Sequence, residues 1–62
     1  MTGSSDDRFR QLRHDLSNPL SAILAETQLL LLRADTLDQE TVTSLKEIEA
    51  LSRRMREILQ RN

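Results

Sequence analysis

The chain has 62 residues, of which 37% are hydrophobic and 31% charged, and it contains one aromatic residue, one histidine and no cysteine. Cores of chains below roughly 70 residues rarely contribute more than about 3–5 kcal/mol, which excludes a multi-domain protein or a self-contained nucleotide-binding enzyme. The net charge of −1 gives no global electrostatic reason to bind nucleic acid or an anionic membrane. Without cysteine, oligomerisation is the remaining way to stabilise so small a unit.

Residues 1–5 lack the basic start and apolar stretch of a signal peptide. We expect them to form a flexible N-terminus before a domain that spans residues 6–62. The longest apolar run, residues 29–32, is far shorter than the roughly 20 residues that a bilayer span requires. We therefore expect no membrane contact by this segment.

Apolar residues recur from Phe9 onward mostly at steps of three and four, which predicts an amphipathic helix over about residues 5–34. They are Phe9, Leu12, Leu16, Leu20, Ile23, Leu24, Leu30 and Leu31. Pro19 lies inside this stretch, where it removes one backbone hydrogen bond and clashes with the carbonyl of Asp15, at a cost of about 3 kcal/mol. Because the apolar spacing continues in phase beyond Pro19, we expect one kinked helix rather than two short ones.

A second apolar series predicts a helix over about residues 37–61. Its members are Val42, Leu45, Ile48, Leu51, Met55, Ile58 and Leu59. Thr36, followed three residues later by Gln39, has the spacing of a capping box that opens this helix, so the loop is predicted at about residues 35–36. So short a connection makes the two helices antiparallel neighbours.

Twelve leucines in so short a chain need more partners than one hairpin offers, because a layer of two helices has no interior. Two hairpins related by a twofold axis give every apolar stripe two neighbours. We therefore predict an all-α fold, an antiparallel helical hairpin that homodimerises into a four-helix bundle. The alternative is a monomeric hairpin that packs on another domain of a longer protein.

The only histidine, His14, lies outside the leucine stripe. At about 100° per residue, the stripe covers roughly 120° of the first helix, and His14 falls opposite its middle. Asn18 follows one turn later on the same outer face. A solvent-facing imidazole beside a strained proline turn is a candidate functional site.

Residues 14–20 read HDLSNPL and resemble the H-box of sensor histidine kinases, in which His is followed by an acidic, a hydrophobic and a variable residue, then Thr or Asn, Pro and Leu. Residues 21–23, SAI, continue the pattern. The resemblance covers nearly the whole chain, since the dimerisation and histidine-phosphotransfer domain of that family is a helical hairpin of this size that dimerises into a four-helix bundle.

The resemblance implies a role for each motif residue. His14 would accept the γ-phosphoryl group of ATP from a separate catalytic domain and donate it to an aspartate of a response regulator. A histidine ordinarily titrates near pH 6.5, so a neutral ring nitrogen is available for this chemistry near pH 7. Asp15 would act as general base. Asn18 would orient the water that dephosphorylates the regulator.

The chain contains no Gly-rich nucleotide lid and no box for ATP or Mg²⁺. We expect the absent catalytic domain to bind both, and this segment to bind no cofactor or metal and to be inactive alone. The resemblance also implies a cytoplasmic segment, whether or not its parent protein is membrane-anchored.

Two further groups of residues are candidates for partner contact. In the resembling family, specificity for the regulator lies just beyond the histidine, at positions that match Ser21, Ala22, Ala25 and Glu26. The second predicted helix is acidic over residues 35–49, with five carboxylates against one lysine, and basic over residues 51–62, with four arginines against one glutamate. Folding the hairpin brings this basic end near His14, so Arg54 and Arg61 are candidates to attract a phosphoryl group or an acidic partner. A solvated arginine face that completes the helix C-terminus is an equally good interpretation.

Two other functions remain open from the sequence. The first is a stand-alone phosphotransferase of a phosphorelay, which shares the hairpin dimer without kinase activity. The second is a non-catalytic dimeric helical scaffold in which His14 has no chemical role.

Overall fold

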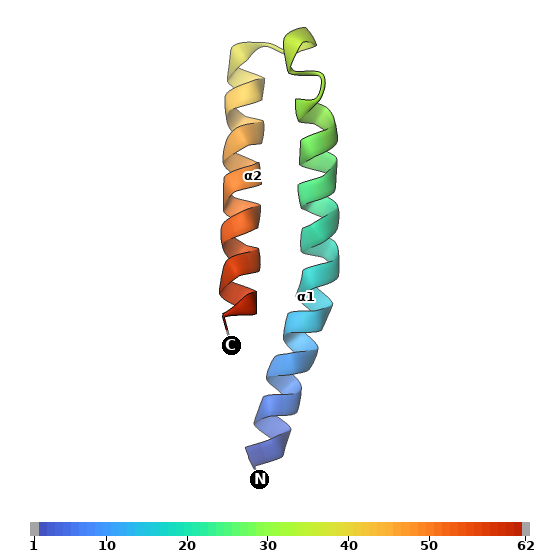
Figure 1. The fold of residues 1–62 in the computed structure, drawn as a ribbon, viewed down its shortest axis with the longest axis vertical. Helices are drawn as coiled ribbons and strands as arrows, with labels where there is room; N and C mark the ends of the chain where they lie inside the picture. Colours follow the sequence, from blue (N-terminus) through green and yellow to red (C-terminus); the bar gives the residue numbers. More distant parts are fainter. Residues whose placement is uncertain (1, 62) are drawn as a thin grey trace.

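The computed structural model describes residues 2–61, with side chains described for residues 7–61. Two helices, α1 (Thr2–Leu31) and α2 (Gln39–Gln60), are joined by a short 3-10 helix, η1 (Ala34–Thr36). The two long helices run antiparallel side by side, and the N-terminal part of α1 extends beyond the C-terminal end of α2 (Figure 1). Residues 2–61 contain no strand. The predicted all-helical hairpin is confirmed.

Helix α1 continues through Pro19, as the phase of the apolar residues predicts. Figure 1 shows it bent, with its N-terminal turns leaning away from the line of the remaining helix. Proline is one cause of such a bend, and a second is present because the Ser17 hydroxyl donates to the Arg13 carbonyl at 2.7 Å. The turn that follows His14 therefore differs from a regular helix.

The observed bounds differ from the expected ones at both ends of α1. The helix begins at Thr2, within the stretch that we expected to be flexible, and Met1 lies outside the described residues. It ends at Leu31 rather than near residue 34, because residues 34–36 tighten into η1. Neither α1 nor α2, within the described residues, has the length and apolarity that a membrane span requires.

The predicted capping box of Thr36 and Gln39 is wrong. Thr36 belongs to η1, where its hydroxyl donates to the Arg33 carbonyl at 2.8 Å, and an extended Leu37 separates it from α2. Asp38 caps the helix instead, since its Oδ1 accepts from the Thr41 backbone N–H at 3.0 Å. Hydrogen bonds from the Thr41 hydroxyl and from its N–H lower the pKa of the Asp38 carboxyl below its ordinary value.

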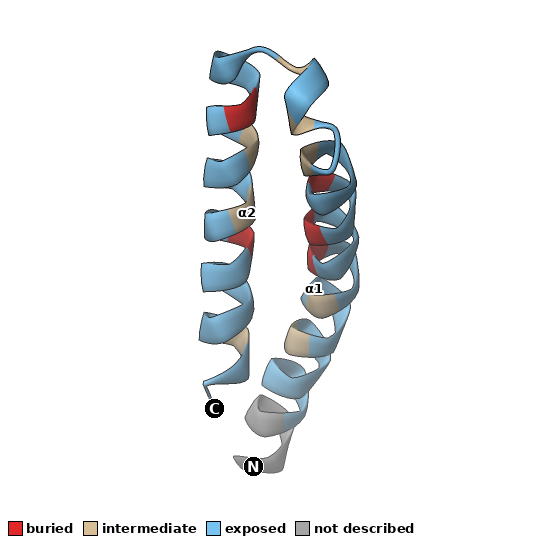
Figure 2. Cartoon of the chain, turned by 45° about the horizontal axis from the view of Figure 1, so that its top comes forward, coloured by how far each residue is buried: buried red, intermediate tan, exposed pale blue. Residues whose placement is uncertain are grey.

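The contact between α1 and α2 holds the most buried side chains of the described part (Figure 2). They are Leu20, Leu24 and Thr27 from α1, and Val42 and Ser52 from α2. The Thr27 hydroxyl donates to the Ile23 carbonyl at 2.7 Å, which satisfies a buried polar group within its own helix. Because small polar residues take up part of this contact, many of the larger apolar side chains lie outside it.

Large apolar side chains of both helices remain exposed on one side of the hairpin. At about 100° per residue, those of α1 lie roughly 70° from the direction of its buried residues, and those of α2 lie roughly 120° from theirs. Because the helices run antiparallel, these displacements bring both sets to the same side. We name this surface the apolar face: Leu12, Leu16, Ile23, Leu30, Ile48, Leu51, Met55 and Ile58. A surface of this kind on a small chain is a candidate interaction site.

Candidate functional site

His14 projects into solvent from α1, with 72% of its side chain exposed. The neighbouring Asp15 carboxylate is 60% exposed, and its Oδ1 lies 3.7 Å from the His14 Nδ1. This distance is longer than a hydrogen bond, so no hydrogen bond joins the two groups in this conformation. Because Nδ1 is the ring nitrogen that faces the Asp15 carboxylate, the other nitrogen, Nε2, does not contact that carboxylate.

Gln11 holds the Asp15 carboxylate from the preceding turn. Its Nε2 donates to the Asp15 Oδ1 at 2.9 Å, across the four-residue spacing that makes helical side chains neighbours. The same oxygen therefore lies between the Gln11 amide and the His14 ring. Sequence reasoning missed Gln11, although its spacing from Asp15 was a usable signal.

Two shallow hollows border the His14 ring. The first is lined by Arg10, Arg13, His14, Ser17 and Asn18, and the second by Asp7, Arg10, Gln11 and His14. His14 and Asn18, which the sequence analysis paired on one outer face, thus line the same hollow. Two guanidinium groups and an amide beside an exposed imidazole give this hollow the chemistry of a site for a small anion. Arg10 and Arg13 were not among the predicted site residues.

One of these guanidinium groups is partly engaged elsewhere. The Arg13 guanidinium carbon lies 5.9 Å from the centroid of the Phe9 ring, within the range of a cation–π contact. Arg13 is half-buried, whereas Arg10 is exposed. The Phe9 ring stays exposed although it belongs to the leucine stripe.

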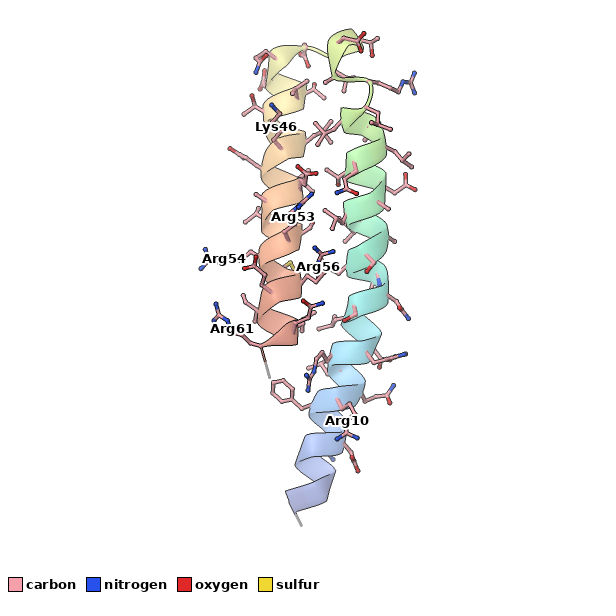
Figure 3. The ribbon with its side chains drawn as sticks, viewed as in Figure 1. Arg10, Lys46, Arg53, Arg54, Arg56 and Arg61 are labelled. Atoms are coloured by element: carbon pink, nitrogen blue, oxygen red, sulfur yellow. The ribbon has the colours of Figure 1, made fainter. Side chains whose placement is uncertain are left out.

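The C-terminal end of α2 lies beside the N-terminal half of α1, as the hairpin predicts. Arg54 and Arg61 nevertheless project from α2 on the side away from α1 (Figure 3). Within one chain, the structure therefore does not bring these two arginines to His14. Arg53 pairs with Glu49 on its own helix, at 3.4 Å between Nη2 and Oε2.

The remaining predicted positions lie between His14 and the hairpin loop. Ser21, Ala22, Ala25 and Glu26 are all exposed on α1. Three of the four side chains are small, so a partner helix has close access to the α1 backbone there. Among the described residues, no group of three His, Cys, Asp or Glu side chains is placed to hold a metal ion.

Comparison with known proteins assigns the chain to a family. Residues 5–61 match the family described as the His Kinase A (phospho-acceptor) domain. No curated protein and no solved structure matches the chain. The match includes α1 from residue 5 onward, the loop, α2 and the HDLSNPL motif, and domains of this family are parts of histidine kinases in two-component signalling. The chain belongs to the His Kinase A phospho-acceptor domain family.

Proposed function

We propose that this chain is the dimerisation and phosphoacceptor module of a two-component sensor histidine kinase, with His14 as the residue that is phosphorylated. The observation that carries the proposal is the exposure of the only histidine, in a motif of the matched family. Phosphoryl transfer depends mostly on positioning and on charge stabilisation, so the acceptor must be reachable by a separate catalytic domain. An imidazole with 72% of its side chain exposed meets that need.

The phosphorylation step uses both ring nitrogens of His14. The Nε2 lone pair attacks the γ-phosphorus of ATP, an N–P bond forms, and the bond to the leaving ADP oxygen breaks. The ring is then cationic, and the Nδ1 proton passes to the Asp15 carboxylate. The 3.7 Å separation of these two groups supports the assignment, because a small side-chain rotation closes it to hydrogen-bond length. In the next step, the phosphoryl group passes from Nε2 to an aspartate oxygen of a response regulator.

Asn18 is proposed to act in the dephosphorylation of the response regulator. Side chains on a helix tilt toward its N-terminus, so the Asn18 amide leans over the turn that carries His14, and the two line one hollow. An amide that both donates and accepts hydrogen bonds is suited to hold a water against the phosphorylated regulator. This role predicts a regulator phosphatase activity in addition to phosphotransfer.

The apolar face is proposed to bind a second copy of the hairpin, giving a four-helix bundle. The buried core of one hairpin is too small to stabilise the chain alone, since its large apolar members are Leu20, Leu24 and Val42. A twofold axis through the apolar face would cover both stripes at once. His14 lies on the opposite side of α1 and would remain accessible in the dimer.

We further propose that the ATP-binding domain of the parent kinase supplies ATP and Mg²⁺, and that a receiver domain docks on the exposed residues beyond His14. Ser21, Ala22, Ala25 and Glu26 would form the α1 part of that docking surface. No residue of this chain is assigned to nucleotide binding.

The test of the proposal is incubation of the chain with the ATP-binding domain of its parent kinase and γ-labelled ATP. We expect an acid-labile label on the wild-type chain and none on His14→Ala. Retention of the label by His14→Ala would overturn the assignment. For Asn18, the expected result of Asn18→Ala is retained phosphorylation with loss of regulator dephosphorylation, and unchanged dephosphorylation would remove that role.

A further inference from the structure

Arg10 occupies a position around His14 that the motif does not explain. Apart from His14 itself, it is the residue that lines both hollows beside the imidazole. It lies four residues before His14, a spacing that puts the two Cβ atoms about 5–6 Å apart on the helix surface. The long side chain of arginine covers that distance easily.

The surroundings of Arg10 leave its guanidinium available. It makes no ion pair or hydrogen bond with any side chain of residues 7–61, whereas Arg13 in the same hollow stacks on Phe9. Figure 3 shows Arg10 on the part of α1 that extends beyond the end of α2, so the second helix does not cover it. The guanidinium is therefore an exposed fork of donors one turn from the acceptor ring.

We propose that Arg10 is an anion-binding residue of the phosphoacceptor site, which contacts the phosphoryl group carried by His14. This inference rests on the proposed function and extends it to a residue outside the HDLSNPL motif. The planar guanidinium donates two parallel N–H bonds to phosphoryl oxygens, a geometry that an ammonium group does not reproduce. In the unphosphorylated chain, Arg10 attracts the anionic donor to the ring.

The test uses phosphoramidate as a small phosphoryl donor, so that no partner domain enters the result. In this reaction the P–N bond of the donor breaks, ammonia leaves, and a new bond joins phosphorus to the imidazole nitrogen. Phosphorus NMR of the product follows the pH titration of the phosphoryl group. A contact with Arg10 favours the dianion and lowers the titration midpoint.

We compare the wild-type chain with Arg10→Ala, Arg10→Lys and Arg8→Ala. Arg8→Ala is the matched control, because it removes the same charge from an exposed position that points about 160° away from Arg10 on the same helix. For Arg10→Ala, we expect the midpoint to rise by about 0.5 pH unit and the labelling rate to fall about fivefold, effects typical of exposed charge pairs. The midpoint and the rate of Arg10→Lys should fall between those of the wild type and of Arg10→Ala. Those of Arg8→Ala should match the wild type.

Added salt tests whether the effect of Arg10 on the midpoint and the rate is electrostatic. The differences in midpoint and rate between wild type and Arg10→Ala should shrink as the ionic strength rises from about 50 mM to about 500 mM, because the Arg10 guanidinium and the phosphoryl group are exposed to solvent. An Arg10→Ala chain that is labelled on His14 with the wild-type midpoint and rate would overturn this inference and leave the proposed function intact. Failure of the wild-type chain to form any phosphohistidine would instead overturn the proposed function, and the role of Arg10 with it.

Discussion

Leu51 lies on the apolar face of α2 with 61% of its surface exposed, and the proposed dimer would bury it. Replacement by alanine keeps the helix propensity and removes three carbon atoms, worth about 2.4 kcal/mol when such a group is fully transferred from water. Scaled to the exposed fraction, the loss is about 1.5 kcal/mol per protomer and about 3 kcal/mol per dimer. Leu51→Ala should therefore raise the Kd for dimerisation about a hundredfold.

Sedimentation equilibrium over a concentration series measures that Kd directly. Leu29→Ala is the matched control, because Leu29 is the same residue type, is 57% exposed and lies on α1 outside the apolar face. We expect the control to dimerise like the wild type. Equal effects of the two substitutions, or a wild-type chain that stays monomeric at high micromolar concentration, would refute the assignment of the apolar face to a second copy.

Three further predictions concern the site, the bend and the helix cap. Asp15→Asn should slow phosphorylation of His14 about a hundredfold or more, because the ring loses its proton acceptor. The rate is measured with labelled ATP and a saturating concentration of the ATP-binding domain. Pro19→Ala should stabilise the chain by roughly 1–3 kcal/mol in urea unfolding at a fixed protomer concentration, since it restores the hydrogen bond to the Asp15 carbonyl; a loss of stability would contradict the strain assigned to this turn. The lowered pKa of Asp38 means that its stabilising contribution is complete above its ordinary value of 3.8 and is lost as the pH falls through the folded-state pKa. Thermal unfolding should therefore show the Tm of the wild type falling more steeply on acidification than that of Asp38→Asn, and parallel curves would refute the charged cap.

The two helices could be predicted from the sequence because each carries an apolar series long enough to fix its phase. Pro19 did not interrupt that phase, and α1 continues through it. Periodicity alone could not show which apolar residues of each helix pack against the other helix and which lie on the apolar face. In α2, Val42 is buried against α1 while Leu51 stays on the apolar face, and the small Ser52 takes a buried position that no hydrophobic pattern indicates.

The loop was predicted less well because two capping signals overlap there. Thr36 and Gln39 have the spacing of a capping box, and Asp38 is itself a strong N-cap residue. The choice between them depends on where the chain leaves α1. Because α1 ends at Leu31, the following residues form η1 and an extended Leu37, which leaves Asp38 at the start of α2.

The centre of the site could be predicted, but its surroundings could not. The outward direction of His14 follows from helix phase and agrees with its exposure. Gln11 and Arg10 lie outside the motif, so only their four-residue spacing from Asp15 and His14 indicated them. For Arg54 and Arg61, the position along the hairpin was predictable, but their direction depends on which face of α2 packs against α1, and both project away from it.

The most direct test of the account is proton–nitrogen NMR of the isotope-labelled chain before and after phosphorylation. The chain has one histidine, so its two ring nitrogens give the only imidazole signals and need no assignment by mutation. We predict a new coupling of phosphorus to the Nε2 of His14, together with loss of the proton from Nδ1 to the Asp15 carboxylate. Phosphate on another residue, or on Nδ1, would contradict it.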